Sequence, residues 1–362
     1  MVIVGKNHFK IITFAGMTAE EKYMMRCLQL AENGLGNVAP NPMVGAVIVH
    51  DGKIIGEGYH REYGGPHAEV NAIEDVLKNH SEEILADSSL FVNLEPCSHH
   101  GKTPPCCDLI LLKKIKKIFI AMKDPFAQVN GEGIRKLTSA GLDVVTGICE
   151  KEAQELNRRF IHFHIQKRPY VILKYAQSLD GFVSPKNPTP ENRWITNSFS
   201  KKLVHKWRSE EPAIMVGTKT AILDNPELTV REWPGKDPLR IVIDRTLKLP
   251  DNLHLLNGKV KTLIINEKKN HIDGLREWHQ LNFNEAVLPQ LMTFMHDRNI
   301  QSVIVEGGLQ LLQKFIDAGI WEEARILTGD KWLGSGIQAP KIEGEIFFQT
   351  TIVKDRLVVL RK

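Results

Sequence analysis

A histidine, a glutamate and two cysteines stand in this sequence in the order that a mononuclear metal centre requires. One residue separates His67 from Glu69, and Cys97 and Cys106 follow with eight residues between them. One neutral imidazole and two thiolates leave the fourth position of a tetrahedral Zn²⁺ ion open, as catalytic rather than structural zinc sites require. We therefore predict that His67, Cys97 and Cys106 bind Zn²⁺.

Glu69 is too close to His67 to be a comfortable fourth ligand, so it is free to move protons. Zn²⁺ lowers the pKa of a water molecule that it binds to about 7. A carboxylate nearby can take a proton from this water and pass it to a ring nitrogen and a departing amine. Glu69 is therefore the predicted catalytic residue.

The cysteine loop leaves one ambiguity, because Cys106 and Cys107 are adjacent. We prefer Cys106 as the third ligand, with Cys107 beginning the next helix as a buried residue. Pro96 suits the first position of a helix, and a helix N-terminus favours the thiolate of a cysteine beside it. We therefore expect Cys97 to lie at the start of a helix.

Composition limits the class of protein. The chain has 362 residues, 42% of them apolar and 25% charged, which is typical of a globular protein with two domains. An odd number of cysteines, five, with three bunched in one loop, indicates a reducing cytosol rather than a disulfide framework. The net charge of +4 is mild, and no stretch is long and apolar enough to span a membrane. The helix expected from Thr18, with a capping box to Glu21, suggests that residues 1–16 are a dispensable extension.

Hydrophobic periodicity predicts α/β structure in both halves of the chain. In the first half we expect a hairpin (44–49 and 54–59), helices at 18–33, 68–78, 107–112 and 131–140, and strands at 89–94, 118–122 and 142–146. A charged helix at 151–163 leads to a boundary near 168. The second half is expected to hold strands at 170–176, 213–216, 239–244, 261–266, 302–306 and 323–327, helices at 198–210, 286–298 and 308–318, and a polar loop at 220–226.

A histidine and a glutamate two positions apart, followed by a Pro-Cys pair and a second cysteine, is the signature of zinc nucleobase deaminases. Here the gap between the cysteines is longer than usual. The match extends further, because four segments closely resemble the bacterial bifunctional riboflavin biosynthesis family. These are NPMVG at 41–45, GYH at 58–60, PHAE at 66–69 and EPCSHHGKTPPCC at 95–107.

This resemblance implies two domains and two activities. Residues 17–160 would form a cytidine-deaminase-like α/β/α sandwich with a mixed sheet, acting on 2,5-diamino-6-ribosylamino-4(3H)-pyrimidinone 5′-phosphate. Residues 168–362 would form a dihydrofolate-reductase-like domain that uses NADPH to reduce the ribosyl side chain. The resemblance also implies that Asn41 and His60 hold the pyrimidine, with His99 and Lys102 near its phosphate. Asn41 is equally suited to a turn, and Lys102 to an ordinary surface position.

The motifs of the second half are individually weaker. The Gly307-Gly308 pair stands between a strand and a helix, where free backbone N–H groups can bind a phosphate. A Rossmann fold is not supported, because the sequence contains no G-x-G-x-x-G motif. The family resemblance implies cofactor contacts at Ala176, Trp194, Thr220, Asp224, Arg245, Gly308, Leu309, Gln310, Leu311, Leu312, Gln313 and Lys314. It implies substrate contacts at Asn192, Arg208, Leu228, Arg231 and Glu306.

The arginines also have a physical rationale, because a guanidinium fork matches a phosphate. Trp194 either stacks on nicotinamide or fills the core, and Arg245 lies either near the adenosine phosphate or in an exposed turn. The chain departs from the family at the proline-rich stretch 185–190 and at Asn192, where serine is common.

Two other functions fit parts of the sequence less well. A nucleic-acid-editing deaminase with a C-terminal binding module would need basic and aromatic residues near the zinc loop. Aromatic residues make up only 7% of the chain. A reductase with a degenerate deaminase domain is disfavoured by the intact Glu69. We therefore expect a phosphorylated pyrimidine as the partner, no nucleic acid, no membrane, a cytoplasmic location and a homo-oligomer.

Overall fold

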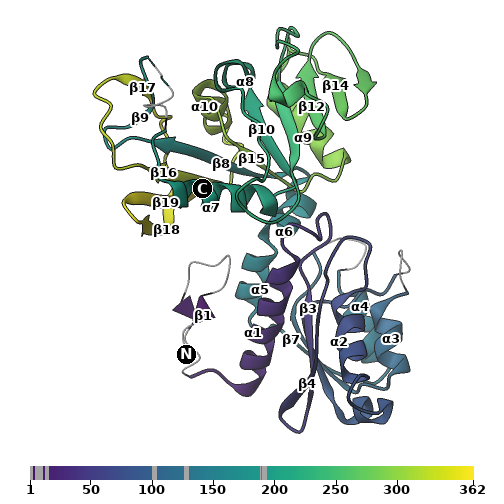
Figure 1. The fold of residues 1–362 in the computed structure, drawn as a ribbon. Coiled ribbons are helices and arrows are strands. Elements are labelled where there is room, and N and C mark those ends of the chain that lie inside the picture. The colour runs from purple at the N-terminus through teal and green to yellow at the C-terminus, as the bar shows by residue number, and fades with distance from the viewer. Residues whose placement is uncertain are drawn as a thin grey trace. The chain divides into compact units, whose positions relative to one another are not determined.

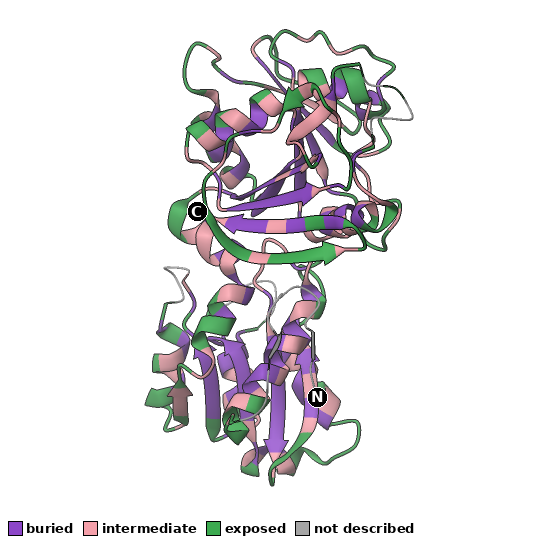
Figure 2. Ribbon diagram, turned by 90° about the vertical axis from the view of Figure 1, so that its left-hand side faces the viewer, coloured by how far each residue is buried: buried purple, intermediate pink, exposed green. Residues whose placement is uncertain are grey.

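The computed structural model describes residues 16–99, 104–125, 130–187, 189 and 194–362 in full. It also describes the backbone of an antiparallel strand pair, β1 (Ile3–Val4) and β2 (Ile11–Ile12). The chain divides into two compact units, residues 1–166 and 167–362. Each unit has its own large sheet, and the central strands of both sheets are buried (Figures 1 and 2).

The first unit opens with α1 (Ala19–Ala31), whose predicted capping box is confirmed: the Glu21 N–H donates to Thr18 Oγ1 at 3.2 Å, and the Thr18 N–H donates to the Glu21 carboxylate at 2.8 Å. Its five-stranded sheet has the order β4-β3-β5-β6-β7, in which β3 is antiparallel to β4 and β5 while β5, β6 and β7 are parallel. The mixed sheet was predicted. The elements after α1 are a 3₁₀ turn (Glu32–Gly34), β3 (Gly45–His50), β4 (Lys53–Tyr59), α2 (Ala68–Val76), a second 3₁₀ turn (Glu82–Asp87), β5 (Ser89–Leu94), α3 (Cys106–Leu112), β6 (Lys117–Met122), α4 (Glu132–Ser139), β7 (Asp143–Thr146), α5 (Glu150–Leu156) and α6 (Arg158–Gln166).

Helices cover both faces of this sheet, which makes the predicted α/β/α sandwich. α1 and α5 pack against one face, and α2, α3 and α4 pack against the other. Alternate residues of β3 enter the two cores, Val47 on one side and Ile48 on the other. This explains why β3 is apolar without interruption rather than alternating.

The prediction of a single helix at 151–163 is wrong, because two separate helices, α5 and α6, meet at Asn157. The side chain of Asn157 is buried and bonds the backbone of Met43 on both sides. Its Oδ1 accepts from the Met43 N–H at 2.8 Å, and its Nδ2 donates to the Met43 carbonyl at 2.9 Å. Asn157 therefore fixes the chain two residues after Asn41.

The second unit is built on a ten-stranded sheet of order β13-β14-β12-β11-β10-β15-β8-β16-β19-β18. Its centre is parallel, and antiparallel strands complete both edges. α9 and α10 pack on one face, and α7 and α8 on the other. The elements are β8 (Tyr170–Gln177), β9 (Phe182–Pro185), α7 (Ser198–Glu210), β10 (Ala213–Gly217), α8 (Thr218–Asp224), β11 (Leu239–Ile243), a 3₁₀ turn (His254–Leu256), β12 (Thr262–Asn266), β13 (His271–Asp273), β14 (Arg276–Gln280), α9 (Val287–Asp297), β15 (Ser302–Val305), α10 (Leu309–Asp317), β16 (Glu323–Thr328), β17 (Gly336–Gln338), β18 (Glu345–Ile352) and β19 (Asp355–Arg361).

Two expectations for this half are corrected. Most of the loop expected at 220–226 is helix α8, whose Ala221 packs into the core. The strands β9, β13, β14, β17, β18 and β19 were not predicted. β13 and β18 lie at the sheet edges with mostly exposed side chains, so they carry no apolar run that periodicity detects.

Among the described residues, no helix is both long and apolar enough to cross a membrane.

The clamp on Met43 gives a stability prediction. Replacing Asn157 with Ala leaves the buried N–H and carbonyl of Met43 without this amide, which we expect to destabilise the first unit by about 1–3 kcal/mol. Gln154→Ala, at an exposed position of α5, is the control and should change stability by less than about 0.5 kcal/mol. Urea denaturation measures both variants, and equal midpoints would show that the clamp contributes nothing.

Candidate active sites

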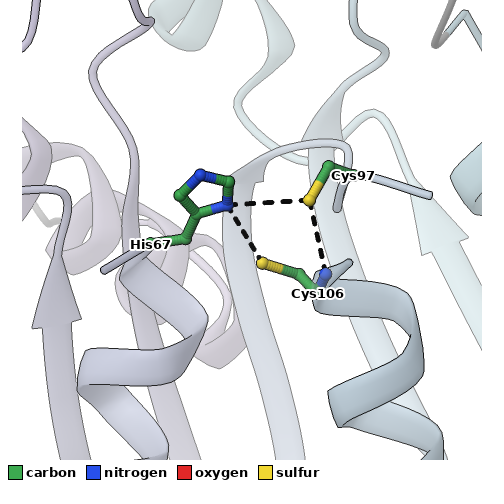
Figure 3. A group of neighbouring side chains, drawn as sticks. All are labelled: His67, Cys97 and Cys106. Carbon is green, nitrogen blue, oxygen red and sulfur yellow. Dashed lines mark hydrogen bonds between the residues drawn. The ribbon is translucent and has the colours of Figure 1, made fainter. Parts of the chain in front are cut away.

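Three potential metal ligands from separate segments meet in the first unit (Figure 3). His67 is the N-cap residue of α2, Cys97 lies in the loop after β5, and Cys106 is the first residue of α3. The Nδ1 atom of His67 lies 3.2 Å from the Cys106 sulfur and 3.6 Å from the Cys97 sulfur. These three residues are the metal ligands predicted from the sequence.

The donor set fits a zinc ion. Zn–S and Zn–N bonds of about 2.3 and 2.0 Å in a tetrahedron place the ligand atoms about 3.5–3.8 Å apart. The three ligand atoms all lie within 4.8 Å of one another, and within the described ranges they are the one such group of metal-binding side chains.

Cys97 is not at the start of a helix as expected, because the Pro96 segment is a loop and α3 begins at Cys106. A helix amide nevertheless reaches Cys97: the Cys106 N–H donates to the Cys97 sulfur at 3.3 Å. The thiol of Cys106 also donates to Cys97, and this bond, with contributions from His67, lowers the pKa of Cys97 to about 4. The same bond raises the pKa of Cys106, and the bond to Cys97 raises that of His67. The polar contacts at Cys97 therefore favour its thiolate, the form that binds a metal ion.

Glu69 lies in the first turn of α2 and is 3% exposed. Burial raises its pKa, against the opposing charge of His67. A raised pKa brings a carboxyl group closer to the range in which general acid–base catalysts work.

Cys107 is turned away from the triad. Its buried thiol donates to the Pro96 carbonyl at 3.3 Å, and burial raises its pKa to about 12. Such a thiol stays protonated, so the geometry favours Cys106 as the ligand.

Glu95 supports the cysteine loop and was missed from the sequence. Its buried carboxylate accepts from the N–H groups of Gly131 and Gly133, both at 2.9 Å, at the start of α4. A Cβ atom on Gly133 would overlap the Pro96 carbonyl oxygen. Glu95 thus holds α4 directly against the Pro96–Cys97 segment. The one feature of the sequence that could have pointed to Glu95 is its position directly before Pro96.

Asn41 and His60 lie beside the triad. Asn41 Nδ2 is 3.1 Å from His60 Nε2, and His60 Nδ1 is 3.0 Å from the Pro66 carbonyl. One neutral tautomer, protonated on Nδ1, satisfies both contacts, and burial lowers the pKa of His60 accordingly. The imidazole rings of His60 and His67 meet edge to face with centroids 5.5 Å apart. His99 is exposed in the cysteine loop, and Lys102 falls outside the described residues.

In the second unit, some of the predicted cofactor residues, among them Thr220 and Gly308, lie at the carboxyl edge of the parallel strands, where ligands of open α/β sheets bind. Gly217 ends β10 and Gly308 is the N-cap residue of α10 after β15. Gly217 donates its N–H to the Gly307 carbonyl at 2.8 Å, and a Cβ atom on Gly308 would lie 2.7 Å from Thr220 Oγ1. A side chain at position 308 would therefore crowd the Thr220 hydroxyl where the two helix starts approach each other.

The remaining cofactor residues divide into two groups. Leu309 and Gln310 are at the N-terminal end of α10, and Ala176 is close to the carboxyl end of β8. The second group points elsewhere. Leu311 and Leu312 are buried in the core, and the side chain of Gln313 donates a hydrogen bond to Asp317. Lys314 and Asp224 are exposed, the latter at the end of α8.

Trp194 and Arg245 are both exposed. Trp194 is 51% exposed, so the alternative in which it fills the core is wrong. Arg245 donates from Nε to Glu267 at 2.7 Å, and its side chain is 54% exposed.

Glu306 is at the centre of a buried charge cluster. The Nε and Nη2 atoms of Arg208 donate to its two carboxylate oxygens at 3.0 and 2.8 Å, and Lys174 Nζ lies 3.9 Å away. Burial raises the pKa of Glu306, but the charges of Arg208 and Lys174 outweigh it and lower the pKa to about 2. No role was predicted for Lys174, although a lysine within an otherwise apolar strand is unusual and could have indicated a functional residue.

The loop after α8 holds the other predicted substrate residues. Leu228 is buried with a positive φ of 55°, and Arg231 is exposed and paired with Glu227 at 2.8 Å. The Arg231 N–H donates to His205 Nδ1 at 3.1 Å, which ties this loop to α7. Asn192 is outside the described residues.

Both halves match known families. Residues 17–122 match the cytidine and deoxycytidylate deaminase zinc-binding region, and residues 169–359 match the RibD C-terminal domain.

Full-length relatives are also found. RibD of Aquifex aeolicus is 38% identical over 88% of this chain and 89% of its own length, and RibD of Escherichia coli is 35% identical over 87% and 89%. The structure resembles that of a deaminase/reductase from Thermotoga maritima, with a TM-score of 0.86 and 34% identity over 95% of this chain and 98% of that one. Acinetobacter baumannii RibD gives a TM-score of 0.84 with 30% identity over the same shares.

The fold and the two sites define an enzyme in which a zinc-dependent deaminase domain is followed by a dihydrofolate-reductase-like reductase domain. The chain belongs to the RibD family of bifunctional riboflavin biosynthesis enzymes. A reductase domain rather than a nucleic-acid-binding module occupies the second half, so the editing-deaminase alternative is not favoured.

The geometry predicts the outcome of two cysteine substitutions. Cys106→Ser should lose the zinc ion, because it removes one of three protein ligands, whereas Cys107→Ser should keep one zinc per chain. Metal analysis of the purified proteins measures this. Zinc retained by Cys106→Ser but lost from Cys107→Ser would reverse the assignment.

Proposed function

We propose that the first unit deaminates 2,5-diamino-6-ribosylamino-4(3H)-pyrimidinone 5′-phosphate and that the second unit reduces the ribosyl side chain of the product. The observation that carries this proposal is the convergence of His67, Cys97 and Cys106 beside the buried Glu69. The Thermotoga maritima relative is described as a diaminohydroxyphosphoribosylaminopyrimidine deaminase and 5-amino-6-(5-phosphoribosylamino)uracil reductase.

His67, Cys97 and Cys106 would hold a zinc ion, which would supply Lewis-acid activation of water. Glu69 takes a proton from the water at a carboxylate oxygen and passes it to the substrate. The amino group then leaves as ammonia, and its carbon gains the oxygen of water. We assign Asn41, oriented by His60, to the pyrimidine, and the family resemblance assigns Lys102 to the phosphate.

In the reductase domain, bound NADPH would supply the hydride that reduces the C1′ carbon of the open-chain sugar imine. We assign the cofactor to the carboxyl edge of the sheet, at Gly308 with the start of α10, Thr220, Ala176, Trp194 and Arg245. The substrate contacts Arg208, Leu228, Arg231, Glu306 and Asn192.

Lys174 is placed to donate the proton that the reduced imine nitrogen requires. Its Nζ lies 3.9 Å from the Glu306 carboxylate, and burial lowers its pKa, which favours release of the proton.

We assign residues 17–160 to the deaminase domain and 168–362 to the reductase domain. We propose a reducing, cytoplasmic location, in line with five cysteines that are not joined in disulfides. The protein is proposed to act as a homo-oligomer on a small molecule and to bind no nucleic acid.

Glu69→Gln tests the deaminase mechanism. The amide cannot carry protons, so deaminase turnover should fall about 10²–10⁴-fold, while zinc content and reduction of the deaminated substrate stay unchanged. The matched control is Glu74→Gln, at an exposed position of the same helix. Turnover of Glu69→Gln within a few-fold of the parent enzyme would remove Glu69 from the mechanism.

Arg231→Ala tests the substrate site of the reductase. Loss of a charge-assisted phosphate contact should weaken binding of the reductase substrate by roughly tenfold or more, with NADPH affinity unchanged. Calorimetric titration with each ligand separates the two effects, and Arg356→Ala on β19 is the control. A loss of NADPH affinity instead would place Arg231 on the cofactor.

A further inference from the structure

Four neighbouring parallel strands of the second unit end at one edge in the order β15, β10, β11, β12. The helix starts at Gly308 and Thr218 follow the first two strands, and Arg245 and Glu267 follow the other two. Strands are about 4.8 Å apart, so this edge is long enough for an extended dinucleotide. The Lys174–Glu306–Arg208 cluster lies on the β8 and β15 side, which leaves β11 and β12 for the adenosine end.

At the ends of β11 and β12, two cations share one carboxylate. Arg245 Nε lies 2.7 Å from one oxygen of Glu267, and Lys268 Nζ lies 3.2 Å from the other. The side chains of Arg245 and Lys268 are about half exposed, whereas Glu267 is 22% exposed. The three side chains therefore present a net positive charge to solvent.

The backbone beneath this cluster is fixed. The Glu267 N–H donates to the Arg245 carbonyl at 3.0 Å, which continues the ladder between β11 and β12. Asn266 is fully buried, and its Oδ1 accepts from the N–H groups of Lys268 and Lys269, both at 2.8 Å. The Arg245 guanidinium also lies 5.6 Å from the centroid of the Phe283 ring.

We propose that Arg245 and Lys268 bind the adenosine 2′-phosphate of NADPH, and that Glu267 limits the discrimination between NADPH and NADH. This inference rests on the proposed reductase function. NADPH differs from NADH only by the phosphate dianion, which two cations attract. The Glu267 carboxylate repels that dianion, and it accepts a hydrogen bond from the ribose 2′-hydroxyl of NADH.

The test is the dissociation constant of NADPH and of NADH, measured by calorimetry on the full chain and four variants. Arg245→Ala and Lys268→Ala should each weaken NADPH binding about tenfold and leave NADH binding within about twofold. Glu267→Gln should tighten NADPH binding about threefold, because it removes one like charge. Lys269→Ala is the matched control, since the ammonium of Lys269 lies over the Trp278 ring, 4.8 Å from its centroid, away from Glu267.

The outcomes separate this inference from the function on which it rests. If the parent protein binds neither dinucleotide, the reductase proposal fails and this inference fails with it. If the parent binds NADPH but Arg245→Ala and Lys268→Ala keep its preference over NADH, the inference alone is wrong. Weaker NADPH binding by Glu267→Gln would overturn the role given to Glu267.

Discussion

Two thiolates held a few ångströms apart repel each other, and burial raises the free energy of their charge. The first unit contains groups that offset this cost. The amide of Cys106 donates to the Cys97 sulfur, and the His67 ring lies against both sulfurs. Glu95 anchors the start of α4 so that the helix packs on the Pro96–Cys97 segment. The ligand set is therefore assembled by helix starts and a buried carboxylate, and a zinc ion completes the charge balance.

The reductase domain contains two clusters in which cations surround a carboxylate. Glu306 is bonded by Arg208 and flanked by Lys174, and Glu267 is shared by Arg245 and Lys268. Each trio combines two cations with one carboxylate, so each retains a positive charge that suits an anionic ligand. The first trio is buried, where its charges interact strongly, and the second is near solvent, where screening weakens them. The buried trio suits the reaction centre that we propose, and the exposed trio suits the proposed recognition of the cofactor.

The zinc triad was predictable from the sequence because its residue types, in this order, form the signature of zinc nucleobase deaminases. The α/β layers were also predictable, since buried strands and amphipathic helices carry clear periodicity. Edge strands such as β13 and β18 escaped prediction because their side chains face solvent. Glu95, Asn157 and Lys174 escaped for another reason. Their importance depends on long-range partners, namely Gly133, Met43 and Glu306, that only the folded chain brings near.

The central claim is that one chain deaminates a pyrimidine ribotide and then reduces its sugar. Incubating the purified protein with the diaminopyrimidinone ribotide, with and without NADPH, and identifying the products by mass spectrometry tests this directly. The account predicts the deaminated ribotide alone without NADPH, and a product with two further hydrogens when NADPH is present. Unchanged ribotide in both incubations, or reduction without deamination, would contradict it.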